Sequence, residues 1–365
     1  MPLNTIPNTG LTSRGYPSDR ITTPIIINGD MSVAQRGTSS TSADYVVDRF
    51  NFRVSNTDQF AYTHSQSTTV PTGQGFSNSW KLDVTTAETS LDSDEEVAFQ
   101  TRLEAQNLQS LKFGTSSAET LSLSFWVRSN KTGTYGIYLR QHDAGKNYVA
   151  SYTISSADTW EKKIVTISGN TADTIANDNG IGFWINWTLA AGSSLDGATM
   201  NSWHTAATEI APTNQVNITD STSNEWYITG VQLEVGEFDS TTIPSFPFES
   251  YANSLEKCQR YYFEEGNNAQ SFVAGAFNAS ASPFRYTFMK PMRAAPSGSI
   301  GGSINTDLKL YSAGSDKTLT GVSFAAITTH GARVEIDSSG AFTAGQTGHF
   351  YLLNNTGKLK FDAEL

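Results

Sequence analysis

The stretch of residues 230–263 constrains the fold most, because its hydrophobic periodicity changes along its length. Apolar side chains occupy every second position of its first part, at Val231, Leu233 and Val235. This period of two is typical of a strand with one buried face and one wet face. Pro244 and Pro247 then interrupt regular structure, since proline lacks a backbone donor and keeps the preceding residue extended. The stretch therefore predicts the end of one β domain.

A short helix is expected after these prolines. Tyr251, Leu255, Cys258 and Tyr262 follow one another at helical spacing, which places them on one face of a helix over 251–263. Cys258 is the one cysteine of the chain, so no intrachain disulfide can form. We expect its thiol to be buried and inert, as free cysteines commonly are.

Composition favours β structure throughout the 365 residues, a length sufficient for two or three domains. Charged residues make up 16% of the chain, and Ser, Thr, Gly and Asn are abundant. A net charge of −11 argues against nucleic acid as a partner, because no basic stripe is present to neutralise phosphates. No segment approaches the roughly 20 apolar residues of a membrane span, and the first residues do not resemble a signal peptide. We expect a soluble protein made in a cytoplasm, without membrane insertion.

Short strands separated by turn residues predict an all-β fold of two antiparallel domains. Residues 1–23 have no periodicity and should form an extended arm. Residues 24–243 should form a jelly-roll sandwich, 244–265 a linker with a short helix, and 266–365 a second, smaller β-sandwich domain. The expected strands of the first domain are 23–27, 49–54, 60–65, 79–84, 97–104, 120–128, 133–140, 148–154, 161–167, 181–189 and 225–235, with a helical turn at 106–111. Those of the second are 272–277, 284–289, 308–311, 321–325, 333–337, 350–354 and 359–364.

Several segments together resemble tail-fibre and related virion proteins of tailed bacteriophages. They are IINGDMSVAQRGTSSTSADYVVDRF, FQTRLEAQNLQSLKFGTSSAETLSLSFWVRSNKTGTYGIYLR, TLAAGSS, TNQVNITDSTSNEWYITGVQLEVGE and CQRYY, all between residues 21 and 263. PMRAAPS and the ending FDAEL also resemble phage proteins but are less diagnostic.

The resemblance implies a jelly roll of the carbohydrate-binding-module type, opened by INGDMS and closed by ITGVQLE. It also implies a homotrimer in the virion, assembled in the host cytoplasm. Residues 1–23 would attach the chain to other tail or capsid proteins, and the protein would bind host cell-surface polysaccharide through several copies at once.

A structural calcium ion is expected where the first and last strands of such a jelly roll meet. Asn28 and Asp30 lie at the opening turn, and Glu234 lies on the closing strand, which we expect beside Asp30. Ca²⁺ takes six to eight oxygen ligands from carboxylates, amides and backbone carbonyls. The alternative is that Asn28 and Asp30 simply form a turn and Glu234 faces solvent. No other cofactor is expected.

Aromatic side chains are the candidates for sugar binding, because their flat apolar faces stack on sugar C–H groups. In GFWINW, Phe183, Ile185 and Trp187 share one strand face and leave Trp184 on the other. Most tryptophans of the chain should lie in the core. Trp203, with His204 beside it in a predicted loop, is the better surface candidate, and Trp184 is the other.

No catalytic signature appears, and the histidines lack metal-binding spacing. The acids of LDSDEEV, Asp92, Asp94, Glu95 and Glu96, are more simply explained as a solvated turn than as a glycosidase pair. We therefore expect a non-enzymatic glycan-binding tail fibre or fibre-like appendage. The alternative is a purely structural head decoration, fibre or tail adaptor; a polysaccharide depolymerase is less favoured.

Overall fold

The computed structural model describes residues 24–57, 59–205, 209–266 and 270–365. The chain divides into two compact units. Unit 1 comprises Met1–Met31 and Phe52–Phe248, and unit 2 comprises Ser32–Asn51 and Glu249–Leu365. The predicted arm at 1–23 lies outside the described residues.

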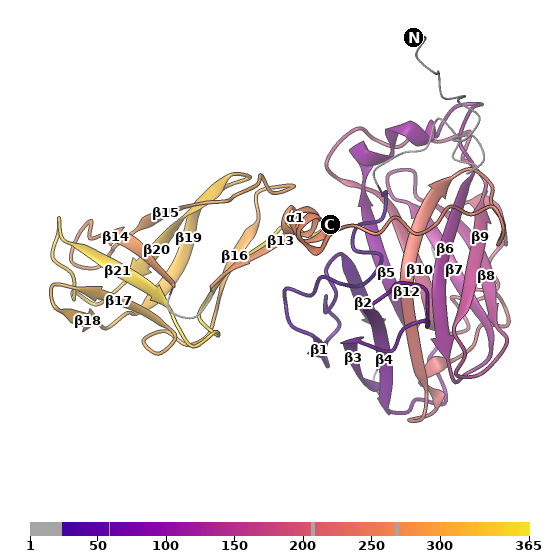
Figure 1. The fold of residues 1–365 in the computed structure, drawn as a ribbon, viewed down its shortest axis with the longest axis horizontal. Helices are drawn as coiled ribbons and strands as arrows, with labels where there is room; N and C mark the ends of the chain where they lie inside the picture. Colours follow the sequence, from indigo (N-terminus) through magenta and orange to yellow (C-terminus); the bar gives the residue numbers. More distant parts are fainter. Residues whose placement is uncertain (1–23, 58, 206–208, 267–269) are drawn as a thin grey trace, which may run out of the picture. The chain divides into compact units, whose positions relative to one another are not determined.

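Unit 1 is built from antiparallel strands arranged in two sheets (Figure 1). In the first sheet, β3 (Ala61–Ser67), β4 (Ser79–Thr86), β12 (Glu225–Val235), β6 (Leu121–Ser129) and β9 (Glu161–Ile167) lie side by side in that order. The second sheet is six-stranded, in the order β11 (Trp203–His204), β8 (Lys146–Ile154), β7 (Gly133–Gln141), β10 (Ile181–Ala191), β5 (Glu96–Glu104), β2 (Phe50–Ser55). The described part of unit 1 also contains the 3₁₀ helices η3 (Ala105–Leu111) and η4 (Ile218–Asp220).

Aromatic rings fill the space between the two sheets. Trp80 of β4 packs on Phe99 of β5 with ring centroids 4.4 Å apart, and Phe125 of β6 meets Trp187 of β10 at 5.7 Å. All four side chains are fully buried. Burial of such large apolar surfaces is the main driving force for the sandwich, and pairs of rings add to it.

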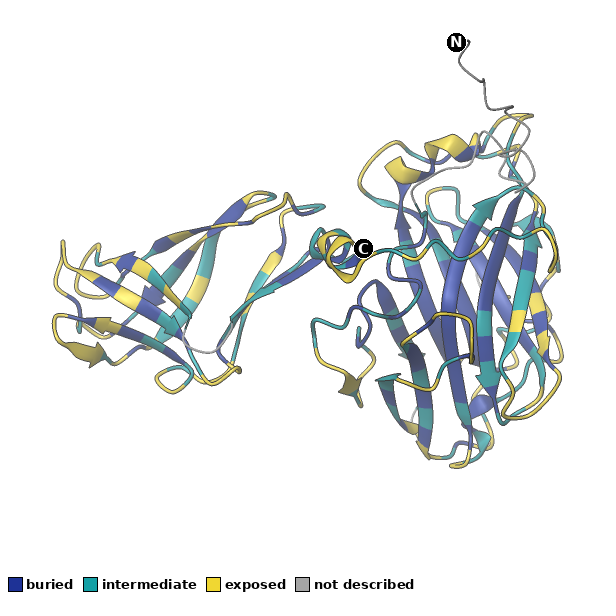
Figure 2. Cartoon of the chain, in the orientation of Figure 1, coloured by how far each residue is buried: buried dark blue, intermediate teal, exposed yellow. Residues whose placement is uncertain are grey.

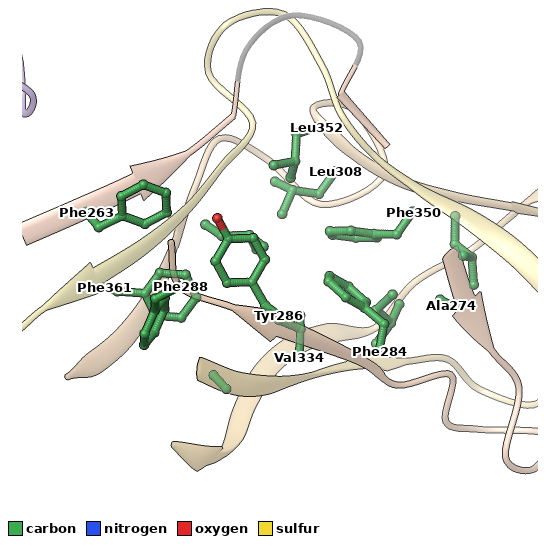
Figure 3. Close-up of a cluster of buried hydrophobic side chains, with 14 of the residues drawn as sticks. Phe263, Ala274, Phe284, Tyr286, Phe288, Leu308, Val334, Phe350, Leu352 and Phe361 are labelled. Carbon is green, nitrogen blue, oxygen red and sulfur yellow. The ribbon is translucent and has the colours of Figure 1, made fainter. Parts of the chain in front are cut away.

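Unit 2 contains three small antiparallel sheets. The first has the order β13 (Tyr262–Glu265), β22 (Lys358–Asp362), β16 (Ser297–Gly301). The second has the order β14 (Gln270–Gly275), β21 (Thr347–Leu352), β17 (Leu308–Ser312), β18 (Ser315–Lys317). The third has the order β15 (Phe284–Thr287), β20 (Gly331–Asp337), β19 (Gly321–Thr328). Phe284 and Tyr286 of β15 point into a core shared with Phe350 and Phe361 (Figure 3). Figure 2 shows buried residues along the strands of each unit and exposed residues mainly in the connections.

The predicted all-β class is confirmed, and most predicted strands are present with shifts of a few residues. The strand predicted at 23–27 is wrong for its described part, because residues 24–27 have no strand assignment. The strands β1 (Ser39–Ser40), β11, β13, β16 and β18 were not predicted. They are short or rich in Ser and Gly, so their sequences carry little alternation.

The domain boundaries differ from the predicted ones in two ways. The C-terminal part of the second unit begins at Glu249, inside the predicted linker of 244–265 rather than at residue 266, and the unit includes Ser32–Asn51, which the sequence analysis placed in the jelly roll. The physical reason is charge: this segment supplies Arg36 and Arg49, which pair with carboxylates at the end of the chain.

The predicted helix is present as α1 (Tyr251–Gln259), capped by the Ser250 side chain. Cys258 is fully buried, as predicted. The predicted apolar face is partly wrong, because Tyr251 is 58% exposed and the chain leaves the helix before Tyr262, which lies on β13. The helix ends at Gln259, so helical spacing no longer relates Tyr262 to the residues of α1. Among the described residues, no helix is long and apolar enough to cross a membrane.

A buried ion cluster, here called the C-terminal clasp, fastens the end of the chain within unit 2. Arg49 is 3% exposed and pairs with Glu364. Its guanidinium carbon also lies 3.5 Å over the Tyr261 ring. Arg36 stands over Tyr262 in the same way and contacts Asp362 at 3.3 Å.

Replacing Glu364 by Gln should destabilise unit 2 strongly. The substitution removes the negative charge beside the buried Arg49, and an ion pair broken on one side typically costs about 3–5 kcal/mol. Differential scanning calorimetry of the full chain should show a lower midpoint for one transition. The matched control is Glu335→Gln, which breaks the exposed pair with Arg333 and should cost at most about 1 kcal/mol. Equal effects of the two substitutions would contradict this role of the clasp.

Candidate functional site

The candidate site lies on the outer face of the six-stranded sheet, the face turned away from the first sheet. In β10, Phe183, Ile185 and Trp187 are fully buried and point toward the first sheet. Trp184 therefore points outward, because successive side chains of a strand alternate between faces. It is half-buried. The predicted division of GFWINW between two faces is confirmed.

Strand register places five side chains in one row across this outer face. Trp184 pairs with Arg102 of β5 on one side and with Arg140 of β7 on the other. Arg140 pairs with Asn147 of β8, which pairs with His204 of β11. Five adjacent strands at a spacing of about 4.8 Å make this row about 19 Å long. We call it the Trp184 row.

Cationic and aromatic groups surround the indole of Trp184. The guanidinium carbon of Arg102 lies 4.7 Å from its ring centroid, and that of Arg140 lies 5.7 Å from it. The imidazole of His142 stacks against it at 5.4 Å and 23°. Cation–π attraction of this kind favours Arg and Trp in particular. Trp184 thus positions two positive charges at the surface.

A second row, next to the Trp184 row, is covered by protein. Tyr138 and Val149 form a small core with residues of the segment that follows β10: Leu195, Ala198, Met200 and Ile210. Asn186 lies in the same row and is fully buried, and its amide nitrogen and oxygen have no partner among the described groups. In the Trp184 row, by contrast, Arg102, Trp184, Arg140 and His204 are partly exposed, and only Asn147 is buried.

Trp203 lies on the opposite face of the sheet from Trp184. Its ring packs among Phe113, Tyr148 and Phe183, and its indole N–H donates to the Ser168 carbonyl at 2.7 Å. It is half-buried and part of β11, not of a loop.

His204, the next residue, faces outward with the Trp184 row, and its Nδ1 lies 3.0 Å from the Ser202 carbonyl oxygen. The structure therefore brings His204 and Trp184 to one face and separates Trp203 from both. Sugar binding by any of the three stays a prediction.

Arg102, Arg140 and His142 were missed because the sequence analysis considered only aromatic side chains. The sequence does contain a signal for Arg102 and Arg140, namely their positions in alternating strands. Arg102 alternates with Leu103, and Arg140 with Leu139, so each belongs to the polar side of a predicted strand. Their convergence on Trp184 depends on the strand order β7-β10-β5, which sequence spacing does not contain.

The acidic cluster of LDSDEEV makes structural contacts. Glu96 is buried, pairs with Arg53 at 2.7 Å and accepts a hydrogen bond from the Tyr138 hydroxyl at 3.2 Å. Burial raises the pKa of this carboxyl. Glu95 accepts a hydrogen bond from the backbone N–H of Asp92 at 2.6 Å. The prediction of a solvated turn is therefore wrong for Glu95 and Glu96, because both side chains are buried.

The predicted calcium residues lie around a close approach of two segments. The N–H of Val231 on β12 donates to the Gly29 carbonyl at 2.9 Å, and a Cβ at Gly29 would lie 2.0 Å from the Val231 oxygen. The opening turn therefore packs against the closing strand. Asn28 is buried with a positive φ of 60°, which suits a turn.

Among the described residues, no group of three or more His, Cys, Asp or Glu side chains could hold a metal ion. Calcium binding by Asn28, Asp30 and Glu234 would thus need backbone carbonyls as further ligands. It stays a prediction.

Comparisons with known proteins give distant structural matches only. No family model and no curated protein matches the sequence. The structure is similar to the enzymatically active domain of bacteriophage CBA120 tailspike protein 4, at 13% identity and a TM-score of 0.31, over 58% of this chain and 21% of that chain. The chain thus spans about a fifth of the tailspike chain.

Two further matches cover nearly the whole of the other chain. A putative sugar binding protein from Bacteroides thetaiotaomicron has 12% identity and a TM-score of 0.34, over 58% of this chain and all of that one. A family 11 carbohydrate-binding module from Clostridium thermocellum has 10% identity and a TM-score of 0.29, over 57% and 99%. Because these TM-scores are low, we take function from the side chains of this chain.

Replacing the outer tryptophan of β10, Trp184, and the inner one, Trp187, should have different effects on stability, because only Trp187 belongs to the core. Trp187→Ala removes a fully buried ring and should cost about 3–5 kcal/mol of unfolding free energy. Trp184→Ala should cost clearly less, since one side of that residue faces solvent. Urea denaturation followed by circular dichroism measures both. A larger loss for Trp184→Ala would contradict the assignment of faces.

Calcium binding at the opening turn predicts a metal-dependent melting temperature. Calcium at one hundred times its dissociation constant should stabilise the folded chain by about 2.7 kcal/mol. Melting curves with calcium and with EDTA test this. The Asp30→Asn variant should lose most of the difference, whereas Asp158→Asn, in an exposed turn, should keep it. If the wild-type protein melts at the same temperature with calcium and with EDTA, the calcium prediction is wrong and Asn28 and Asp30 only form a turn.

Proposed function

We propose that the chain is a non-enzymatic bacteriophage virion protein, a tail fibre or fibre-like appendage, that binds a host surface glycan through the Trp184 row. The observation that supports glycan binding is the row itself: an aromatic ring, two guanidiniums and an imidazole, all partly exposed, aligned along one sheet face, with the buried amide of Asn147 between Arg140 and His204. The resemblance of the sequence to phage tail proteins supports the virion role.

A row of this kind fits an extended ligand better than a compact one. Its length of about 19 Å exceeds a single sugar ring, so several units of a polysaccharide could lie across it. Guanidinium groups donate hydrogen bonds to sugar oxygens, and sugar C–H groups pack on ring edges and faces. Each such contact is weak, so binding would depend on several copies acting together.

A homotrimer would provide these copies. In this proposal residues 1–23 hold the trimer on other tail or capsid proteins. The particle then presents three copies of the row to one cell surface. Multi-angle light scattering of the purified chain measures the copy number directly.

Binding of the purified full chain to host cells tests the proposal. Wild-type protein should bind cells or their extracted polysaccharide, and Trp184→Ala should weaken binding at least about tenfold, because the ring positions both arginines. The control is Trp160→Ala, which alters a half-buried tryptophan that contacts Tyr227 in the first sheet, and it should bind normally. Absence of binding, with electron microscopy locating the chain on the capsid, would instead indicate a structural decoration or adaptor. Release of reducing sugar from the polysaccharide would indicate a depolymerase.

A further inference from the structure

Arg140 has no acidic partner among the described residues. Several described arginines pair with carboxylates: Arg36, Arg49, Arg53, Arg128 and Arg333. Arg140 forms no ion pair with any described residue, although the chain carries a net charge of −11. Its Nε is buried without a hydrogen-bond partner within the same described part of the chain. A guanidinium is always charged and has five donors to satisfy.

Two neighbouring nitrogens share this property. The indole Nε1 of Trp184 and the Nδ1 of His142 are also buried, with no partner in the part of the chain that the structure describes. All three nitrogens belong to groups that contact one another around the Trp184 ring. An unpaired buried polar nitrogen is unfavourable, so this cluster has hydrogen-bonding capacity that the described residues do not use.

The chemistry around Trp184 is rich in donors and positive charge. Arg102 and Arg140 both lie over the same ring, one on each neighbouring strand. The two arginines supply donors only, and no carboxylate belongs to the Trp184 row. A ligand that supplies both acceptors and negative charge therefore suits these groups best. Planar guanidiniums match carboxylate, sulfate and phosphate oxygens in a bidentate manner.

We propose that the Trp184 row selects glycans that bear an anionic group, which Arg102 and Arg140 bind from the two sides of Trp184. This inference rests on the proposed function and specifies its ligand class. In this arrangement Trp184 holds the two guanidiniums in place by cation–π contact. A neutral sugar would accept hydrogen bonds from the same donors through its hydroxyl oxygens, but it would lack the opposite charge and the bidentate geometry that an anionic group offers to a guanidinium.

Binding of the full chain to three immobilised polysaccharides tests the proposal. The probes are polygalacturonate, which carries carboxylates, dextran sulfate, which carries sulfates, and unmodified dextran, which is neutral. Biolayer interferometry should give at least about tenfold tighter binding to one or both acidic probes than to dextran. The tighter of the two acidic probes identifies the anionic group.

Single substitutions assign this preference to the arginines. Arg140→Gln and Arg102→Gln should each weaken binding to the acidic probe about tenfold and leave dextran binding unchanged. Arg140→Lys should fall between wild type and Arg140→Gln, since it keeps the charge and loses the bidentate geometry. The control is Lys162→Gln, an exposed cation on β9 of the first sheet, which should bind like wild type. Melting curves confirm that every variant is folded.

Three results would overturn the proposal. One is equal wild-type affinity for acidic and neutral probes, or preference for dextran. Another is a loss of affinity for Lys162→Gln as large as that for Arg140→Gln, which would indicate general attraction of polyanions. The third is unchanged binding by both glutamine variants. If host polysaccharide still binds wild type in these cases, the proposed glycan-binding function stands without the charge preference. Failure to bind host cells and every probe overturns both.

Discussion

The packing of Trp187 between the two sheets is the constraint on which the candidate site depends. Its ring meets Phe99 in its own sheet at 5.9 Å and Phe125 in the other sheet at 5.7 Å. Because side chains of a strand alternate, this inward ring fixes Trp184, Asn186 and their cross-strand neighbours on the outer face. A slip of one residue would exchange the two faces. The aromatic core therefore determines the chemistry of the surface.

Unit 2 depends on a different interaction, since its closure involves charge as well as apolar burial. The segment 32–51 contributes Arg36 and Arg49, and the last residues of the chain contribute Asp362 and Glu364. Arg36 and Arg49 lie against Tyr262 and Tyr261, and the pair of Arg49 with Glu364 is almost fully buried, whereas Asp362 is partly exposed. In such surroundings each charge is stable only with its partner present. This requirement explains why a segment from the N-terminal part of the sequence belongs to the C-terminal unit.

Sequence patterns predicted the strands better than they predicted which strands are neighbours. The strand at Glu225–Val235 has the predicted bounds, because strong alternation and flanking turn residues mark it. The clasp and the Trp184 row were not predicted, since each joins residues far apart in sequence. Arg49 and Glu364 meet because of chain topology, and Arg102 and Arg140 meet Trp184 because β10 lies between β5 and β7. Local periodicity predicts neither this pairing nor this strand order.

The contacts of Trp184 also change how an exposed aromatic residue on a sheet should be interpreted. Sequence reasoning treats such a ring as a flat platform for sugar C–H groups. Here two guanidiniums and an imidazole already contact the ring, so much of its surface is in use. In the proposed binding mode, specificity is then determined by the two guanidiniums that contact the ring and not by the ring itself. The proposed selection of ligands by charge then depends on Arg102 and Arg140, with the tryptophan as their support.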